Sequence, residues 1–281
     1  MVMTKISRVM AIMINLCLKP LGVKLTKMRT QQTGTPDVVK LSKYKQLIQE
    51  FHGWFSESIF PDLPSTENRC ELLEELMGTG LSEAMYILAF LHRSMKLEGD
   101  VCEFGVAQGT TSALLANEIL TSDKHLWLFD SFEGLPKPSA KDKLNDDIFD
   151  LGSIEAYQGT MRCSIDEVRS RMSAIQFPSS RLQIIPGFIE ETRKNARLPD
   201  KLCFAYVDFD FYEPTSIALT FLSEHLSVGG SVIIDDYGFF SSGVKTAVDE
   251  FMATHSDSFE MIIPPKYAGH CVILVKKPKM T

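Results

Sequence analysis

Four aspartates follow two apolar runs in the second half of the chain and could hold a cation. Asp208 and Asp210 lie in Y-V-D-F-D-F-Y-E, and Asp235 and Asp236 end the run S-V-I-I-D-D. Alternate residues of an extended segment project to one side, so Asp208 and Asp210 are predicted to point together. Carboxylates this close raise one another's pKa unless a cation compensates, and hard oxygen ligands suit Mg²⁺ or Ca²⁺. The alternative is that these acids cap helix N-termini.

A second group of residues suits a nucleoside ligand. Glu103, Gly105 and Gly109 lie in E-F-G-V-A-Q-G-T-T-S, where glycines allow close backbone approach, but the third glycine of a dinucleotide fingerprint is missing. By itself this turn equally fits a plain tight turn. Asp130 follows about one strand–helix unit later, and a carboxylate there accepts both hydroxyls of a ribose. Two acids without a phosphate cradle favour an adenosyl ligand that carries an amino group, which indicates S-adenosylmethionine.

The acids follow a regular alternation of short apolar runs and helical stretches. The apolar runs are residues 100–106, 126–130, 181–187, 202–210, 229–236 and 270–275, and the helical stretches are 110–120, 164–172, 214–226 and 243–255. This order predicts an α/β fold with a mostly parallel sheet covered on both faces. Ligands of such sheets bind beyond the carboxyl ends of the strands, where all six acids are expected to lie.

The first 95 residues have a different, helical pattern. Leu81, Met85, Leu88, Leu91 and Met95 recur at helical spacing, which predicts one buried face. Residues 9–18 form a short apolar run between basic residues, too short to span a bilayer, and 33–36 (T-G-T-P) form a predicted break. The run is predicted to be an amphipathic helix that rests on an anionic membrane surface. Packing on its own domain or on a partner subunit is the alternative.

Composition narrows the class of protein. The 281 residues carry a formal net charge of -7, which argues against a general nucleic-acid binder. The six cysteines are scattered without a C-x-x-C pair, so we expect reduced thiols in a cytoplasmic protein. His225 and His255 lie at predicted helix ends and are expected to cap carbonyl groups. The polar segment 136–158 has no periodic pattern and is predicted to be a lid or specificity element.

Five motifs occur in order between about residue 99 and residue 250, namely E-F-G-V-A-Q-G, F-D-S-F-E-G-L-P, I-I-P-G-F-I-E-E-T, Y-V-D-F-D-F-Y-E-P-T and V-G-G-S-V-I-I-D-D-Y-G. In these motifs and their spacing the chain resembles a family of metal-dependent sugar O-methyltransferases related to macrocin O-methyltransferase. The resemblance implies a Rossmann-like class I methyltransferase fold, S-adenosylmethionine as donor and Mg²⁺ as cofactor. It implies metal ligands at Asp208, Asp235 and Asp236, with Asp210 as the catalytic base. Phe209 stands where the family has a glycine.

We therefore predict a seven-stranded, mostly parallel sheet with helices on both faces and an N-terminal helical extension. The predicted parts are a leader helix in residues 1–30, a helical region in 31–95 and a methyltransferase domain in 96–281. The residues predicted to bind the donor are Glu103, Gly105, Gly109, Thr110, Asp130 and Ser131.

The predicted acceptor is a hydroxyl of a sugar on a natural product or glycan. A catechol or other phenolic diol is the alternative acceptor, and a non-catalytic adenosyl-binding protein is the alternative from another class. We expect a cytoplasmic homo-oligomer that binds no nucleic acid and touches the inner face of the membrane through its N-terminal helix.

Overall fold

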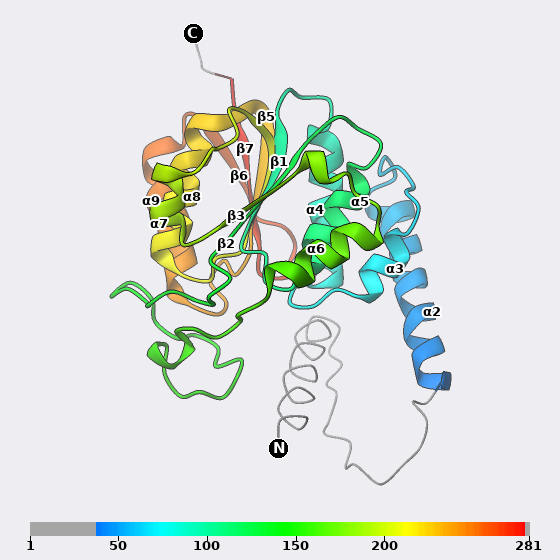
Figure 1. The fold of residues 1–281 in the computed structure, drawn as a ribbon, viewed down its shortest axis with the longest axis horizontal. Coiled ribbons are helices and arrows are strands. Elements are labelled where there is room, and N and C mark those ends of the chain that lie inside the picture. Colours follow the sequence, from blue (N-terminus) through cyan, green and yellow to red (C-terminus); the bar gives the residue numbers. More distant parts are fainter. Residues whose placement is uncertain (1–37, 279–281) are drawn as a thin grey trace.

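A seven-stranded sheet lies between two layers of helices in the computed structural model, which describes residues 38–278 (Figure 1). The strand order is β3-β2-β1-β4-β5-β7-β6. The first five strands of this order pair in parallel, and β7 and β6 complete the sheet in antiparallel pairing. The predicted fold class and strand number are thereby confirmed. The strands are β1 (Asp100–Phe104), β2 (Leu126–Asp130), β3 (Leu182–Pro186), β4 (Leu202–Val207), β5 (Leu226–Ile234), β6 (Phe259–Ile262) and β7 (Val272–Lys276).

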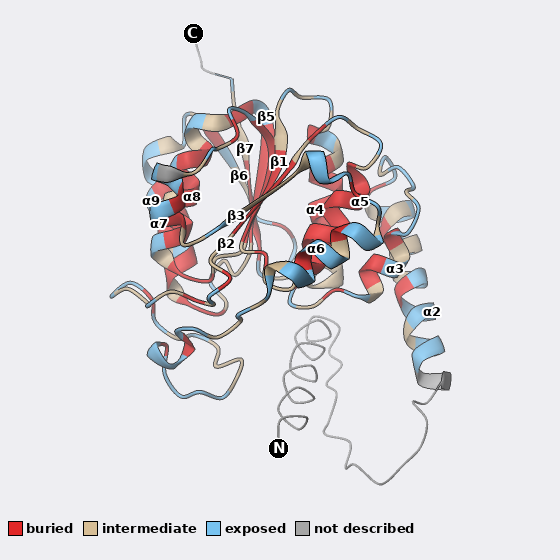
Figure 2. Ribbon diagram, in the orientation of Figure 1, coloured by how far each residue is buried: buried red, intermediate tan, exposed pale blue. Residues whose placement is uncertain are grey.

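Three helices cover each face of the sheet. On one side lie α4 (Leu81–Ser94), α5 (Thr110–Glu118) and α6 (Ile165–Ala174), and on the other α7 (Ile189–Asn195), α8 (Tyr212–His225) and α9 (Ser242–His255) (Figure 1). Every residue of β4 is buried, as expected for a central parallel strand with both faces covered. Figure 2 shows the buried residues concentrated in the strands and on the helix sides that face them.

Two short elements were not predicted from the sequence. Strand β6 has four residues and pairs only with β7, and helix α7 has seven residues directly after the β3 turn. Such short segments carry too few apolar positions for a periodic pattern. Their structure depends on the neighbouring strands, so it becomes visible only in the folded chain.

The N-terminal region contributes to the main core. It contains α2 (Val38–Trp54), the π-helix η2 (Phe55–Ile59) and α3 (Arg69–Glu74), followed by α4. Met85, Leu88 and Leu91 of α4 are fully buried, which confirms the predicted apolar face, and α4 packs against β4 and β5. No helix in residues 38–278 combines the length and hydrophobicity of a membrane span. The predicted leader helix at 9–18, the break at 33–36 and Cys17 lie outside the described residues.

Several smaller predictions can be checked directly. The five described cysteines are free thiols, which confirms the prediction for these positions. Nδ1 of His225 lies 2.9 Å from the carbonyl oxygen of Phe221, and Nδ1 of His255 lies 3.0 Å from that of Phe251. Both imidazoles therefore cap helix carbonyls, as expected.

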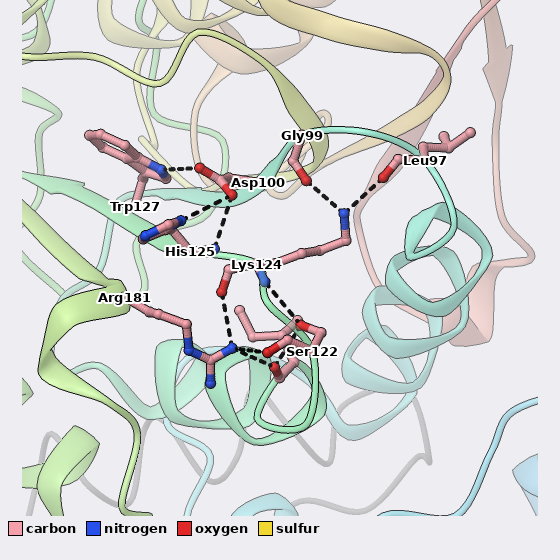
Figure 3. A network of polar contacts seen from close by, with 9 residues as sticks. Leu97, Gly99, Asp100, Ser122, Lys124, His125, Trp127 and Arg181 are labelled. Atoms are coloured by element: carbon pink, nitrogen blue, oxygen red, sulfur yellow. Dashed lines mark hydrogen bonds and ion pairs between the residues drawn. The ribbon is translucent and has the colours of Figure 1, made fainter.

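At the amino ends of the strands, charged side chains form hydrogen bonds with other groups of the protein (Figure 3). Lys124 is buried and donates to the carbonyl oxygens of Leu97 and Gly99 at 2.8 and 2.7 Å. Asp100 accepts hydrogen bonds from the Trp127 indole at 2.9 Å and from the His125 amide at 3.0 Å. The charges of Lys124 and Asp100 are thus compensated by hydrogen bonds within the protein.

A buried ion pair ties the N-terminal helices to the domain. The Arg69 guanidinium on α3 donates to both carboxylate oxygens of Glu118 on α5, at 2.8 and 2.6 Å, and both side chains are almost fully buried. Nε2 of His92 on α4 lies 2.6 Å from Glu118, and the Thr66 hydroxyl donates to it at 2.7 Å. Burial opposes ionisation of Glu118, but the hydrogen bonds from Arg69 and His92 outweigh it and lower the pKa to about 2.

Replacing Glu118 with Gln should lower the free energy of unfolding by about 3–5 kcal/mol, because Arg69 is left buried without its counter-charge. The carboxylate pKa falls from 4.5 to about 2 on folding. Its stabilisation is therefore complete above the unfolded value and is lost as the pH falls toward 2, and this part of the acid dependence should be absent in Glu118→Gln. Urea unfolding at several pH values measures both effects. Glu98→Gln, which removes an exposed pair with Lys201, is the control and should change little.

Candidate active site

A pocket opens beyond the carboxyl ends of the parallel strands, where the strand order predicts a ligand. Its walls come from the turns after β1 to β5, from the loop before α4, and from the segment between β2 and α6. All of the acids identified in the sequence line it, namely Glu103, Asp130, Asp208, Asp210, Asp235 and Asp236. Of the other residues predicted to bind the donor, Gly105, Thr110 and Ser131 line the pocket as well.

The glycine-rich turn after β1 is shaped by contacts inside the protein. Gly105 has φ of 87°, and a Cβ there would lie 1.9 Å from the carbonyl oxygen of Asp208. Gly109, at φ of 74°, precedes α5 and packs against Val168. The Met77 amide donates to the Thr110 hydroxyl at 3.3 Å, which links the turn to the loop before α4. Gly105 therefore lets the ends of β1 and β4 approach closely at the floor of the pocket, and Gly109 lets α5 begin beside Val168.

Asp130 organises the turns on both sides of it. Its Oδ2 accepts hydrogen bonds from the amides of Val106 and Ala107 at 2.8 and 3.1 Å, and its Oδ1 accepts one from Phe132 at 2.6 Å. The Ser131 hydroxyl donates to the carbonyl oxygen of Gly134 at 2.8 Å. A carboxylate has about four acceptor positions, so these three bonds leave capacity for a ligand.

The acids after β4 are not on an extended segment, which corrects the prediction from alternation. Strand β4 ends at Val207, and Asp210 has φ of 62°, in the left-handed region. The Ser241 hydroxyl donates to the carbonyl oxygen of Asp210 at 2.7 Å and fixes this turn from a distant segment. The side chains nevertheless converge, because Asp208, Asp210 and Asp236 each offer an oxygen within 4.8 Å of the others.

Asp235 is directed to another partner. The Tyr206 hydroxyl donates to its Oδ2 at 3.1 Å, and the Asp236 amide donates to its Oδ1 at 2.7 Å. Glu83, a buried residue of α4, lies 3.5 Å from the same Tyr206 hydroxyl. The structure therefore groups Asp210 with Asp208 and Asp236, while the neighbouring Asp235 accepts a hydrogen bond from Tyr206.

Burial and like charge act together on these carboxyls. Burial raises the pKa of Asp208 well above its usual range, and the charges of Asp235 and Asp236 raise it further. Burial, followed by the charge of Asp208, does the same to the pKa of Asp210. Burial also raises the pKa of Glu103 to about 8, although a hydrogen bond from Ser112 opposes this shift. Oxygen ligands gathered in this way could hold Mg²⁺ or Ca²⁺, since a cation relieves the repulsion.

The segment 136–158 is anchored at both sides of the acid cluster. Asp142 is buried and accepts hydrogen bonds from the Tyr212 amide at 2.7 Å and from the Ser139 amide and hydroxyl, both at 2.7 Å. Gly243 is required beside it, because a Cβ there would lie 1.8 Å from Oδ1 of Asp142. A small core of Leu135, Ile154, Tyr157, Phe211 and Phe240 fills the space beneath the segment.

Most of the apolar lining of the pocket and one acid were not predicted from the sequence. Phe209 stands out there only as a departure from the family, and no pattern indicates Ile148, Met161, Phe239 and Phe240. The acid is Glu190 in the first turn of α7. These residues lie in irregular segments or at the start of a short helix. The motif I-I-P-G-F-I-E-E-T contains the signal for Glu190, because it follows a strand end.

Comparison with known proteins places residues 90–262 in the family described as macrocin-O-methyltransferase (TylF). Demethyldecarbamoylnovobiocin O-methyltransferase of Streptomyces niveus is 30% identical over 167 residues, which cover 58% of this chain and 62% of that protein. Mycinamicin III 3''-O-methyltransferase of Micromonospora griseorubida is 31% identical over 169 residues, covering 58% and 64%. The alignments thus span less than two thirds of these relatives.

Solved structures show the same fold. The O-methyltransferase NovP superposes with a TM-score of 0.61 at 23% identity, covering 84% of this chain and 99% of that one. The calicheamicin methyltransferase CalS11 gives a TM-score of 0.54 at 16% identity, covering 89% and 99%. The Rossmann-like methyltransferase architecture expected from the sequence is confirmed by these likenesses.

Replacing Gly105 with Ala should test whether the floor of the pocket depends on the contact with Asp208. Gly152 provides a matched control, because its φ of 86° is nearly the same and a Cβ added there would meet nothing within 4 Å. Gly152→Ala should cost only the left-handed backbone conformation, about 1–2 kcal/mol. Gly105→Ala should cost about 1–3 kcal/mol more, because the β4 end must move. Equal losses in urea unfolding would contradict this account.

Proposed function

The chain belongs to the macrocin-O-methyltransferase family, and on this premise we propose that it transfers a methyl group from S-adenosylmethionine to a sugar hydroxyl of a natural product or glycan. The observation that carries the proposal is the convergence of Asp208, Asp210 and Asp236 at the end of the pocket. A protein that only bound an adenosyl compound would have no use for such a costly cluster of carboxylates.

The donor is proposed to lie across the β1 and β2 turns. Asp130 would accept a ribose hydroxyl with the acceptor position that the three backbone amides leave unused. Glu103, Gly105, Thr110 and Ser131, which line the pocket, would form the surrounding wall, whereas the predicted Gly109 packs against Val168 outside the lining. The acids beyond β4 and β5 would then face the positively charged sulfonium, which favours them electrostatically.

The acceptor hydroxyl is proposed to be activated at the acid cluster. Bound Mg²⁺, held by Asp208, Asp235 and Asp236, would lower the pKa of that hydroxyl and orient it. Asp210 would accept the hydroxyl proton as the oxygen attacks the methyl carbon and the bond from carbon to sulfur breaks. The alternative is that Asp210 and not Asp235 is the third metal ligand. Asp210 lies with Asp208 and Asp236, whereas Asp235 accepts a hydrogen bond from Tyr206.

A phenolic diol is the second candidate acceptor, and the pocket lining favours it. Phe209, Phe239 and Phe240 line the pocket, and aromatic side chains pack well against an aromatic ring. The relatives support a sugar instead, since one of them is named as a methyltransferase of a rhamnosyl group on tetracenomycin C. The two candidates share the same metal chemistry, because either offers two neighbouring oxygens.

Methyl transfer from isotopically labelled S-adenosylmethionine tests the function directly. A glycosylated natural product should be labelled in the presence of Mg²⁺, whereas its sugar-free aglycone should not, and a chelator should abolish the reaction. S-adenosylhomocysteine at one hundred times its Kd should raise the free energy of unfolding by about 2.7 kcal/mol. Labelling of catechol alone would select the second candidate. Absence of both binding and transfer would overturn the proposal.

Asparagine variants should separate the metal ligands from the base. Asp236→Asn and Asp235→Asn should weaken Mg²⁺ binding measured by calorimetry with S-adenosylhomocysteine present, and excess Mg²⁺ should restore part of the rate. Asp210→Asn should retain Mg²⁺ binding but lower kcat by about 10²- to 10⁴-fold, because the side chain no longer accepts the proton. Asp257→Asn at an exposed position is the control. Loss of Mg²⁺ binding in Asp210→Asn but not in Asp235→Asn would reverse the two roles.

A further inference from the structure

Three buried hydroxyl groups, those of Thr111, Thr79 and Tyr206, are hydrogen-bonded one after another and end at Asp235. The hydroxyl oxygens of Thr111, in the first turn of α5, and Thr79, before α4, lie 2.7 Å apart. Thr79 also hydrogen-bonds to the Tyr206 side chain, whose hydroxyl donates to Oδ2 of Asp235 at 3.1 Å. All three side chains are almost fully buried, so each hydroxyl depends on these protein partners for its hydrogen bonds.

Packing of the core does not explain the hydroxyl of Tyr206. Phe204 lies two residues earlier on β4, so its side chain projects to the same face of the sheet. Both rings are buried in the same hydrophobic core, and at position 204 a phenyl ring alone fills the space. A buried phenolic hydroxyl, by contrast, is unfavourable unless a partner is provided for it. The hydroxyl at position 206 therefore needs a reason other than volume.

The partners of Tyr206 determine where its single hydroxyl hydrogen points. The tyrosine oxygen accepts from Thr79 and keeps one hydrogen to donate. Two carboxyl groups lie beside it, Oδ2 of Asp235 at 3.1 Å and Oε1 of Glu83 at 3.5 Å. The shorter distance favours Asp235, so the hydroxyl is directed at the acid that ends β5.

Asp235 keeps the capacity to bind a ligand although both of its oxygens are engaged. Its Oδ1 accepts the Asp236 amide at 2.7 Å, and its Oδ2 accepts the Tyr206 hydroxyl. Each carboxylate oxygen has about two acceptor positions, so each retains one. Asp235 also lines the pocket. Two hydrogen bonds on opposite oxygens restrict rotation of the carboxylate, so a cation in the pocket would meet an oriented ligand.

We propose that Tyr206 is a positioning residue for the cation site, because its hydroxyl fixes the carboxylate of Asp235 in the direction in which it binds Mg²⁺. This inference rests on the proposed function and extends it to a residue that acts only through Asp235. Hydrogen bonds to the ligands of a metal orient those ligands, and their removal typically weakens metal binding by about 10- to 100-fold.

Calorimetry of Mg²⁺ binding at saturating S-adenosylhomocysteine tests the inference. Tyr206→Phe should weaken Mg²⁺ binding by about 10- to 100-fold, while the affinity for S-adenosylhomocysteine without Mg²⁺ stays at the wild-type value. Tyr86→Phe is the matched control, because it removes another buried hydroxyl, on α4, that bonds to Tyr267. This control should bind Mg²⁺ as the wild type does. Urea unfolding shows that each variant is folded.

A double-mutant cycle shows whether Tyr206 acts through Asp235. If it does, Tyr206→Phe should cause little further loss of Mg²⁺ affinity in a protein that already carries Asp235→Asn. A general structural role would cost the same factor in both backgrounds and would overturn the inference. Thr79→Val is a second variant that leaves Tyr206 and Asp235 in place. It should weaken Mg²⁺ binding by a smaller factor, because the tyrosine loses one of the hydrogen bonds that orient it.

The outcomes separate this inference from the proposed function. If the wild-type protein binds Mg²⁺ and both Tyr206→Phe and Thr79→Val bind it equally well, the inference is overturned while the proposed function stands. If the wild-type protein binds S-adenosylhomocysteine but no Mg²⁺, the metal part of the proposed function fails and the inference fails with it.

Discussion

Mutual repulsion among carboxylates at one end of the sheet is the constraint on which the rest of the site depends. Asp208, Asp210 and Asp236 hold oxygens within 4.8 Å of one another although burial and charge oppose their ionisation. The parallel ladder keeps their backbones in place, because the Asp208 amide donates to Phe104 at 2.7 Å and the Asp235 amide donates to Val207 at 2.9 Å. The stability of the whole sheet therefore holds these acids together.

Buried charged groups have different partners at the two ends of the strands. At the amino ends, Lys124 is satisfied by backbone carbonyls, and among the N-terminal helices Glu118 is satisfied by Arg69 and His92. At the carboxyl ends the acids face one another across the pocket instead. This contrast supports the proposal that a bound cation or substrate compensates the charge at the carboxyl ends.

The segment 136–158 completes the pocket as a fixed wall. Asp142 binds the first amide of α8 and fits against Gly243 at the start of α9, so it joins the segment to both helices that flank the acids. The Phe211 and Phe240 rings beneath it, 5.9 Å apart, belong to the turns that carry Asp210 and Asp236. The segment and the turns that carry Asp210 and Asp236 thus share one small core.

The parallel sheet, the buried face of α4 and the location of the acids at the strand ends were predictable from the sequence, because they follow from apolar runs and helical spacing that local geometry imposes. The direction of each acid side chain was not predictable, because it depends on tertiary contacts. Asp210 turns toward Asp208 through a left-handed residue held by Ser241, and Asp235 turns toward Tyr206. The short elements β6 and α7 were likewise not predicted from the sequence. Past the end of a strand no repeating pattern governs side-chain direction, so contacts from distant segments determine it.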